Sequence, residues 1–131
     1  VVIGGWSSIS LALCEQYNEN NNTWTAFPSL NTARHQTGAA VVLGKIYVAA
    51  GYNGTAALSS VEVFGGSSWT LLDSSLLAGR YACAAVNFNN TLLAFGGSVH
   101  TVEVYNPITN TWSTTGPNIS VPLQYVTAIS F

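Results

Sequence analysis

The stretch RYACAAVNF at residues 80–88 is followed by LLAFGG at 92–97, by VEVY at 102–105 and by Trp112. Short runs that are rich in β-branched and aromatic residues and bounded by turn residues predict β-strands. The stretch therefore predicts four short strands, and Asn89-Asn90 between the first two predicts a tight hairpin turn. We find no apolar stripe with the 3.6-residue period of a helix.

The same order of features occurs three times along the chain. A glycine ends the second strand of each unit and a tryptophan lies in the fourth; these are Gly5, Gly51 and Gly97, and Trp24, Trp69 and Trp112. The glycines are 46 residues apart, and so are Arg34 and Arg80, which precede the first strand of two units. A period of this length indicates a repeat protein whose units stack on one another.

The second unit gives the expected strands, at 38–43, 45–50, 60–64 and around Trp69. The first two are almost continuously apolar, which predicts burial of both faces. The third alternates apolar residues with glutamate, which predicts one face in water. Glu62, and Glu103 at the equivalent position of the next unit, are therefore expected to be solvated charges. The three repeat tryptophans are expected in the core, at equivalent contacts between units.

The order Arg, apolar strand, Tyr-Val-x-x-Gly, Val-Glu-Val-aromatic and Trp resembles the Kelch repeat, and residues 106–112 resemble the turn that precedes the Kelch tryptophan. The resemblance implies an all-β fold: a β-propeller with blades of four antiparallel strands, of which this chain carries about three in a ring of about six. Ala50-Gly51 replaces Gly-Gly in the second unit, and the stretch near Val121 has Gln124 but no arginine.

The units divide the chain into four parts. Residues 1–24 are expected to supply three strands of a first blade, residues 34–72 a second blade, residues 80–115 a third, and residues 121–131 the first strand of another blade. The two terminal parts together would make one complete blade. The incomplete terminal parts predict further blades as partners. These blades come either from a second copy that pairs head to tail or from the rest of a longer chain. The absence of methionine favours the longer chain.

Composition excludes several classes of partner. Only 6% of residues are charged and the net charge is −2, so the chain lacks the basic face that binds nucleic acid or anionic membranes. No apolar run reaches the ~18 residues of a membrane helix, so no membrane insertion is expected. Cys14 and Cys83 lie in apolar strands and are expected as buried hydrophobes, although a disulfide between them stays open.

Catalysis is not expected, and neither is a metal or a cofactor. His35, His100, Tyr81 and Cys83 are residue types that copper oxidases of Kelch-like architecture use, but no matching motif surrounds them. A carboxylate pair for glycoside hydrolysis would have to come from the five acidic residues, Glu15, Glu19, Glu62, Asp73 and Glu103, of which Glu62 and Glu103 fall on separate blades.

The resemblance places ligand-binding residues in the loops around the central opening. The candidates are Trp6, Arg34, His35, Tyr52, Asn53, Arg80 and Tyr81. Arg34 and Arg80 could grip a carboxylate, or else satisfy loop carbonyls as repeat residues. Trp6 and Tyr52 follow the repeat glycines, where an aromatic ring could stack on a peptide or sugar or pack on the next blade.

Four Asn-x-Ser/Thr sequons fall in expected turns, at Asn21, Asn53, Asn89 and Asn118. Together with the low charge, they favour an extracellular or secreted protein: a non-catalytic binding or assembly scaffold for a protein or glycan ligand, such as a glycosylated surface or filament component. Two alternatives remain. One is part of a propeller enzyme such as a copper carbohydrate oxidase, and the other is an intracellular Kelch adaptor for protein partners.

Overall fold

The computed structural model describes residues 1–114 and 116–130, and within them every element is a β-strand. The strands are β1 (Val2–Trp6), β2 (Ser10–Asn18), β3 (Thr23–Phe27), β4 (Gly38–Val42), β5 (Lys45–Ala49), β6 (Val61–Phe64), β7 (Trp69–Leu71), β8 (Cys83–Phe88), β9 (Thr91–Gly96), β10 (Glu103–Asn106) and β11 (Thr111–Thr114).

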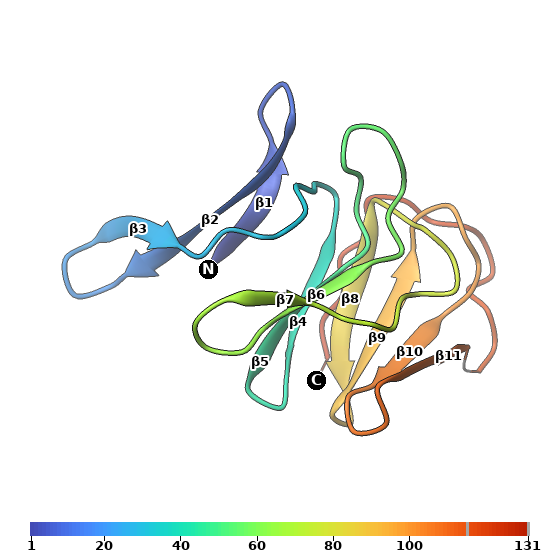
Figure 1. The fold of residues 1–131 in the computed structure, drawn as a ribbon. Helices are drawn as coiled ribbons and strands as arrows, with labels where there is room; N and C mark the ends of the chain where they lie inside the picture. Colours follow the sequence, from blue (N-terminus) through green and yellow to red (C-terminus); the bar gives the residue numbers. More distant parts are fainter. Residues whose placement is uncertain (115, 131) are drawn as a thin grey trace.

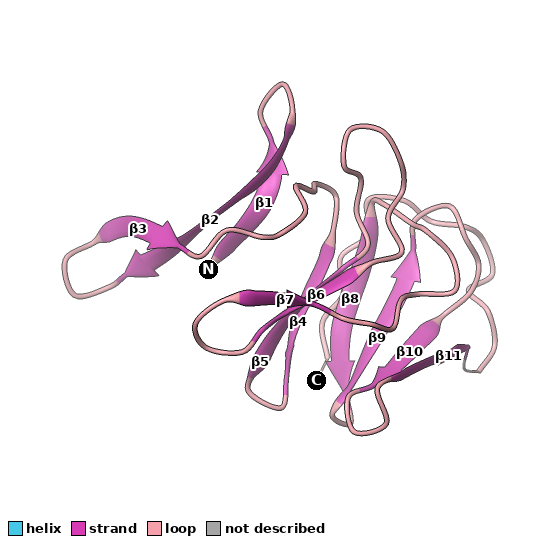
Figure 2. Cartoon of the chain, viewed as in Figure 1, coloured by secondary structure: helices cyan, strands magenta, loops and turns pink. Residues whose placement is uncertain are grey.

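The strands form three antiparallel sheets that stand side by side in chain order (Figures 1 and 2). The first blade is the three-stranded sheet β1-β2-β3, the second is β4-β5-β6-β7 and the third is β8-β9-β10-β11. Strands that follow one another in the chain are neighbours in each sheet, as the repeat predicts. The predicted all-β fold of four-stranded propeller blades is confirmed.

Two-residue turns join the first two strands of the second and third blades. Leu43-Gly44 and Asn89-Asn90 all have positive φ, between 48° and 75°, as a type I′ hairpin requires. The second of these turns is the one that the sequence predicts.

Apolar side chains fill the spaces between successive blades. Val42, Tyr47 and Ala49 of the second blade meet Cys83 and Leu92 of the third in one cluster. A smaller cluster joins the first two blades and includes Cys14 and Trp69. Each blade therefore buries its faces only against its neighbours, which is the stability logic of repeat proteins.

The repeat tryptophans differ in burial, and the prediction that Trp24 lies in the core is wrong. Trp69 is buried against Phe27 of the first blade, and its indole N–H donates to the carbonyl oxygen of Pro28 at 2.7 Å. Trp112 packs partly buried against the cluster between the second and third blades, but its indole N–H has no hydrogen-bond partner among the described residues. Trp24 is 53% exposed, because the described residues place no blade against its face of the first sheet.

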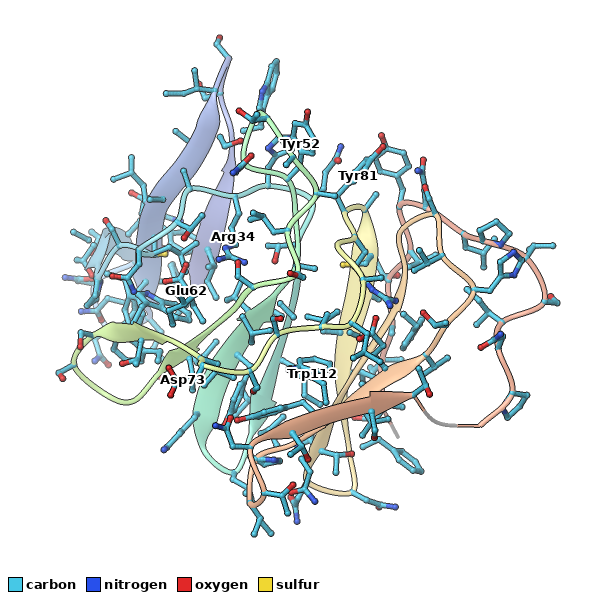
Figure 3. The ribbon with its side chains drawn as sticks, turned by 45° about the vertical axis from the view of Figure 1, so that its right-hand side comes forward. Arg34, Tyr52, Glu62, Asp73, Tyr81 and Trp112 are labelled. Atoms are coloured by element: carbon cyan, nitrogen blue, oxygen red, sulfur yellow. The ribbon has the colours of Figure 1, made fainter. Side chains whose placement is uncertain are left out.

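Buried ion pairs lie inside the second and third blades. The Arg34 guanidinium lies 2.9 Å from a carboxylate oxygen of Glu62 (Figure 3). Arg80 pairs with Glu103 in the third blade, and all four side chains are fully buried. Burial lowers the pKa of Arg34, and the neighbouring Glu62 opposes that shift. Paired in this way, the charges escape the penalty of an isolated buried ion.

These pairs correct the prediction that Glu62 and Glu103 are solvated. Strand alternation points both carboxylates away from the following blade, but the loop from the preceding blade crosses over them. Glu62 accepts hydrogen bonds from the backbone N–H groups of Asn31 and Thr32 at 2.7 and 3.0 Å, and Glu103 accepts one from Leu77. The expectation failed because an alternating pattern does not reveal what a loop covers.

One backbone contact recurs at each step from blade to blade. Gly5 N–H donates to the carbonyl of Arg34 at 2.9 Å, Gly51 N–H to that of Arg80 at 2.9 Å, and Gly97 N–H to that of Leu123 at 2.7 Å. A Cβ on Gly51 would come within 2.9 Å of the His35 carbonyl oxygen, and its φ of 100° also favours glycine. Gly51 therefore permits the close approach of its backbone to the segment 34–37 that leads into β4 of the same blade.

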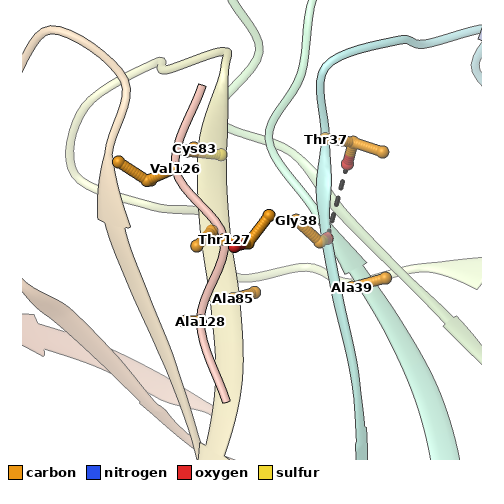
Figure 4. A pocket seen from close by; sticks show the side chains of 9 residues that line it. Thr37, Gly38, Ala39, Cys83, Ala85, Val126, Thr127 and Ala128 are labelled. Atoms are coloured by element: carbon orange, nitrogen blue, oxygen red, sulfur yellow. Dashed lines mark hydrogen bonds between the residues drawn. The ribbon is translucent and has the colours of Figure 1, made fainter. Parts of the chain in front are cut away.

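The segment after β11 was predicted to form a strand at residues 121–131, and no strand occurs within 121–130. The segment runs beside β8, and Val126, Thr127 and Ala128 line a cavity of about 200 Å³ together with residues of β8 and β4 (Figure 4). Within residues 121–130 the segment does not extend any of the three sheets, whose order stays as given above. Two residues of the predicted parts, Thr115 and Phe131, lie outside the described residues.

We predict that Trp69→Ala lowers the free energy of unfolding by about 3–5 kcal/mol, because it empties a packed site between two blades and leaves the Pro28 carbonyl without its donor. Trp24→Ala is the matched control and should cost about 1 kcal/mol or less, because its ring is half exposed. Urea denaturation followed by circular dichroism measures both. Equal losses would contradict the described contacts between blades.

Candidate functional site

A hollow of about 490 Å³ opens among the loops at one end of the first two blades. It lies between the turn that joins β1 to β2, the segment that leads into β4 and the loop that follows β5. The residues that line it are Trp6, Ser8, Ile9, Ser10, His35, Tyr52, Asn53, Gly54 and Thr55. Four of the predicted ligand-binding residues, Trp6, His35, Tyr52 and Asn53, thus come together.

Backbone pairing fixes the floor of this hollow. His35 and Tyr52 form an isolated antiparallel bridge in which each N–H donates to the other's carbonyl oxygen, at 3.0 and 2.9 Å. Tyr52 also pairs with Ala57 across its own loop. The backbone positions of His35 and Tyr52 are therefore fixed by pairing within the second blade.

A polar contact links the first and second blades beneath the hollow. The Ser10 hydroxyl lies 2.9 Å from Nδ1 of His35 and donates to the Tyr52 carbonyl oxygen at 3.2 Å. A hydroxyl has one proton, so both contacts are satisfied when Nδ1 of His35 carries a proton and donates to Ser10. This tautomer leaves Nε2 of the imidazole as an acceptor.

Aromatic rings continue from the hollow toward the third blade. The rings of His35 and Tyr52 meet edge-on with centroids 5.6 Å apart, and those of Tyr52 and Tyr81 meet in the same way at 5.5 Å. Tyr52 and Tyr81 lie at the same end of the molecule (Figure 3). Trp6 and Ile9 on the first blade are 66% and 67% exposed, so the rim presents apolar surface to solvent.

The two arginine candidates lie elsewhere. Arg34 is fully buried, and one of its NH groups also donates to the carbonyl oxygens of Ala50 and Ser60 at 2.8 and 3.0 Å. Arg80 is buried in the same manner, with its donors directed at Gly96, Thr101 and Glu103. The structure therefore uses both guanidinium groups inside the blades rather than in the hollow.

Sequence reasoning placed residues 6–10 among the loops where the resemblance expects a partner to dock, but it did not single out Ile9 or Ser10 as candidate residues. A signal for Ile9 was present in its position beside Ser7 and Ser8 in a turn, where a large apolar side chain has no core to enter. Ser10 carried no signal, because only the folded chain brings it to His35.

The four sequon asparagines are all exposed: Asn21 in the turn between β2 and β3, Asn53 in the loop after β5, Asn89 in the turn between β8 and β9, and Asn118 after β11. The side-chain carbonyl of Asn53 accepts hydrogen bonds from the N–H groups of Thr55 and Ala56, which holds its loop in a turn. Glycosylation of these sites stays a prediction.

The residues considered for catalysis are dispersed. His100 lies on an exposed loop with Nδ1 3.2 Å from the Ile119 carbonyl oxygen. His35 belongs to a different unit and contacts Ser10 instead. Cys83 and Cys14 are buried free thiols, and burial raises the pKa of Cys83. Within residues 1–114 and 116–130, no three His, Cys, Asp or Glu side chains gather where a metal ion could bind.

Comparison with known proteins now gives the family. The family model described as the Kelch motif matches residues 33–72 and 79–118, which make up more than half of the chain. The chain belongs to the Kelch-repeat family. The matched ranges begin just before Arg34 and Arg80, the residues that form the buried ion pairs.

Three relatives show the extent of the similarity. An F-box/kelch-repeat protein of Arabidopsis thaliana is 31% identical over 116 residues, which cover 81% of this chain and 31% of the relative. Human Kelch-like protein 35 is 30% identical over 130 residues, covering 89% of this chain and 21% of the relative. Human Kelch-like protein 24 is 48% identical over 48 residues, which cover 37% of this chain and 8% of the relative. The chain thus spans about a third or less of each relative.

The structure also bears on the membrane. No helix in the described parts of the chain is long and apolar enough to cross a bilayer.

Proposed function

We propose that this Kelch chain is a non-catalytic scaffold that binds a partner protein at the loop hollow between its first two blades. The observation that carries the proposal is the fixed row of aromatic rings, in which Tyr52 packs between His35 and Tyr81 beside the exposed Trp6. Aromatic side chains held rigidly beside a concavity are the groups that dominate binding energy at protein interfaces.

The chemistry of the lining describes the partner. Among the described residues no Asp, Glu, Lys or Arg lines the hollow, and its polar groups are hydroxyls, an amide and an imidazole. Such a surface favours a neutral segment that inserts an apolar side chain beside Trp6 and Ile9 and forms hydrogen bonds through its backbone. The relatives support a scaffold rather than an enzyme only through the shared Kelch repeat.

The test uses a displayed library of random peptides as the probe and this chain as the target. We expect selected neutral, aromatic-containing peptides to bind the chain and to lose about 30-fold or more in affinity with Tyr52→Ala or Trp6→Ala, a loss of at least 2 kcal/mol. Trp24→Ala and Tyr17→Ala, which remove exposed aromatics outside the hollow, are the matched controls and should bind normally. Peptides whose affinity is unchanged by the first pair of variants would contradict the assignment of the site.

We further propose that the chain belongs to an extracellular glycoprotein. Its support is the exposure of all four sequon asparagines together with the low content of charged residues. Asn53 also lines the hollow, so a glycan there would compete with a partner protein. Glycosylation at Asn21, Asn89 and Asn118 is compatible with a free hollow.

Intact mass of the native protein before and after enzymatic removal of N-glycans tests this second proposal. We expect the mass to fall on treatment, and peptide mapping to place the glycans on Asn21, Asn89 or Asn118. Native material in which these three asparagines are unmodified would overturn the proposal and favour an intracellular adaptor for protein partners.

A further inference from the structure

The loop after β5 carries an asparagine followed directly by a glycine, Asn53-Gly54, and both residues line the loop hollow. We propose that Asn53 is a site of spontaneous deamidation, at which its side-chain amide becomes the carboxylate of aspartate or isoaspartate. The reaction needs only water, and its chemistry does not rest on the proposed function. Its consequence for binding does rest on that function, because Asn53 belongs to the proposed binding site.

The reaction joins the backbone nitrogen of Gly54 to the side-chain carbon Cγ of Asn53. The nitrogen gives its proton to a solvent base and attacks Cγ. The bond between Cγ and Nδ2 then breaks, and the amide nitrogen leaves as ammonia with a proton from solvent. Water opens the resulting succinimide ring at either of its carbonyl carbons. The product is a carboxylate on an ordinary backbone (aspartate) or on a lengthened one (isoaspartate), and no oxidant or reductant takes part.

The glycine leaves the attacking nitrogen accessible. Gly54 is exposed, and none of the hydrogen bonds among the described residues occupies its N–H. Glycine has no Cβ to shield the nitrogen, and it reaches backbone angles that other residues avoid. The φ of Gly54 is 96°. No other asparagine in the chain is followed by glycine, so the local sequence singles out Asn53.

The fold holds the Asn53 side chain in an orientation that favours the attack. Its carbonyl oxygen Oδ1 accepts the N–H groups of Thr55 at 2.9 Å and Ala56 at 2.8 Å. Because both donors follow Gly54 in the chain, the side chain is folded forward over the Gly54 peptide group. The attack moves negative charge onto Oδ1, and donors that are already placed at such an oxygen stabilise the charged intermediate.

The loop that would change shape is fixed at its ends and lies against the first blade. Tyr52 pairs with Ala57 across the loop. A Cβ built on Gly54 would lie 3.6 Å from the Ser10 hydroxyl oxygen. Isoaspartate adds a carbon to the backbone between these fixed ends, so the loop would have to bulge beside Ser10. Conversion to isoaspartate therefore alters the shape of the hollow as well as its charge.

The new charge arises where the described lining has none. The polar groups of the hollow are hydroxyls, an amide and an imidazole. A carboxylate at position 53 would lose water when an apolar side chain of a partner entered beside Trp6, and that loss is unfavourable. Conversion therefore weakens binding of a neutral segment. The reacting amide is also the one that would carry a glycan, so the two modifications exclude each other at Asn53.

Incubation of the intact chain at mildly alkaline pH tests the chemistry. The chain is made in bacteria, so that no glycan occupies Nδ2, and peptide mapping by mass spectrometry detects the replacement of NH2 by OH. We expect Asn53 to convert about tenfold faster or more than the exposed Asn89 and Asn118, because the residues that follow these two carry side chains. Gly54→Ala should slow conversion of Asn53 by a similar factor.

A synthetic peptide of residues 51–57 separates the effect of the fold from that of the local sequence. We expect Asn53 of the folded chain to convert at least as fast as in the peptide, because the two N–H donors are held in place by the fold. Clearly slower conversion in the folded chain would show that the loop protects Asn53 and would overturn the inference. Equal rates at Asn53, Asn89 and Asn118 would overturn it as well.

The consequence for binding has its own measurement. Ion-exchange chromatography separates the converted from the unconverted chain, and both are titrated with the peptides selected against the hollow. We expect the converted chain and the variant Asn53→Asp to bind at least about fivefold more weakly. Asn118→Asp adds the same charge outside the hollow and should bind normally. Rapid conversion of Asn53 with unchanged binding would support the chemistry and contradict the proposed function, so the two failures are distinguishable.

Discussion

The buried pair of an arginine and a glutamate inside each complete blade is the interaction on which the rest of the structure depends. Arg34 ties the entrance of β4 to β5 and β6 through Ala50, Ser60 and Glu62, while Glu62 also holds the connecting loop at Asn31 and Thr32. One ion pair thus fixes the strands of a blade and the loop that arrives from the preceding blade. Breaking it would leave a charge in a dry interior.

This anchoring positions the residues around the hollow that we propose as a binding site. His35 directly follows Arg34, so the residue that is locked into the blade sets the place of the imidazole that contacts Ser10 and Tyr52. Tyr81 follows Arg80 in the same way and reaches the other side of Tyr52. In each complete blade the repeat thereby places an aromatic or imidazole ring at the loop end, directly after the buried arginine of the ion pair.

The sequence predicted the blades because their signals are local and repeated: apolar runs, hairpin turns and a 46-residue period. It also predicted four of the residues that line the hollow. It did not predict that Glu62 and Glu103 are buried or that Trp24 is exposed. Both outcomes depend on which segment covers a strand, and this is a property of neighbouring blades rather than of the strand's own pattern. The partnership of Ser10 and His35 is equally long-range.

A double-mutant cycle between Arg34 and Glu62 tests the central claim most directly. Urea unfolding of Arg34→Met, Glu62→Gln and the double variant gives the coupling free energy, with Glu19→Gln as a control for the loss of an exposed carboxylate. The account predicts that each single variant is strongly destabilised and that the double variant loses about 1–3 kcal/mol less than the two losses added together. Additive losses, with no coupling, would contradict it.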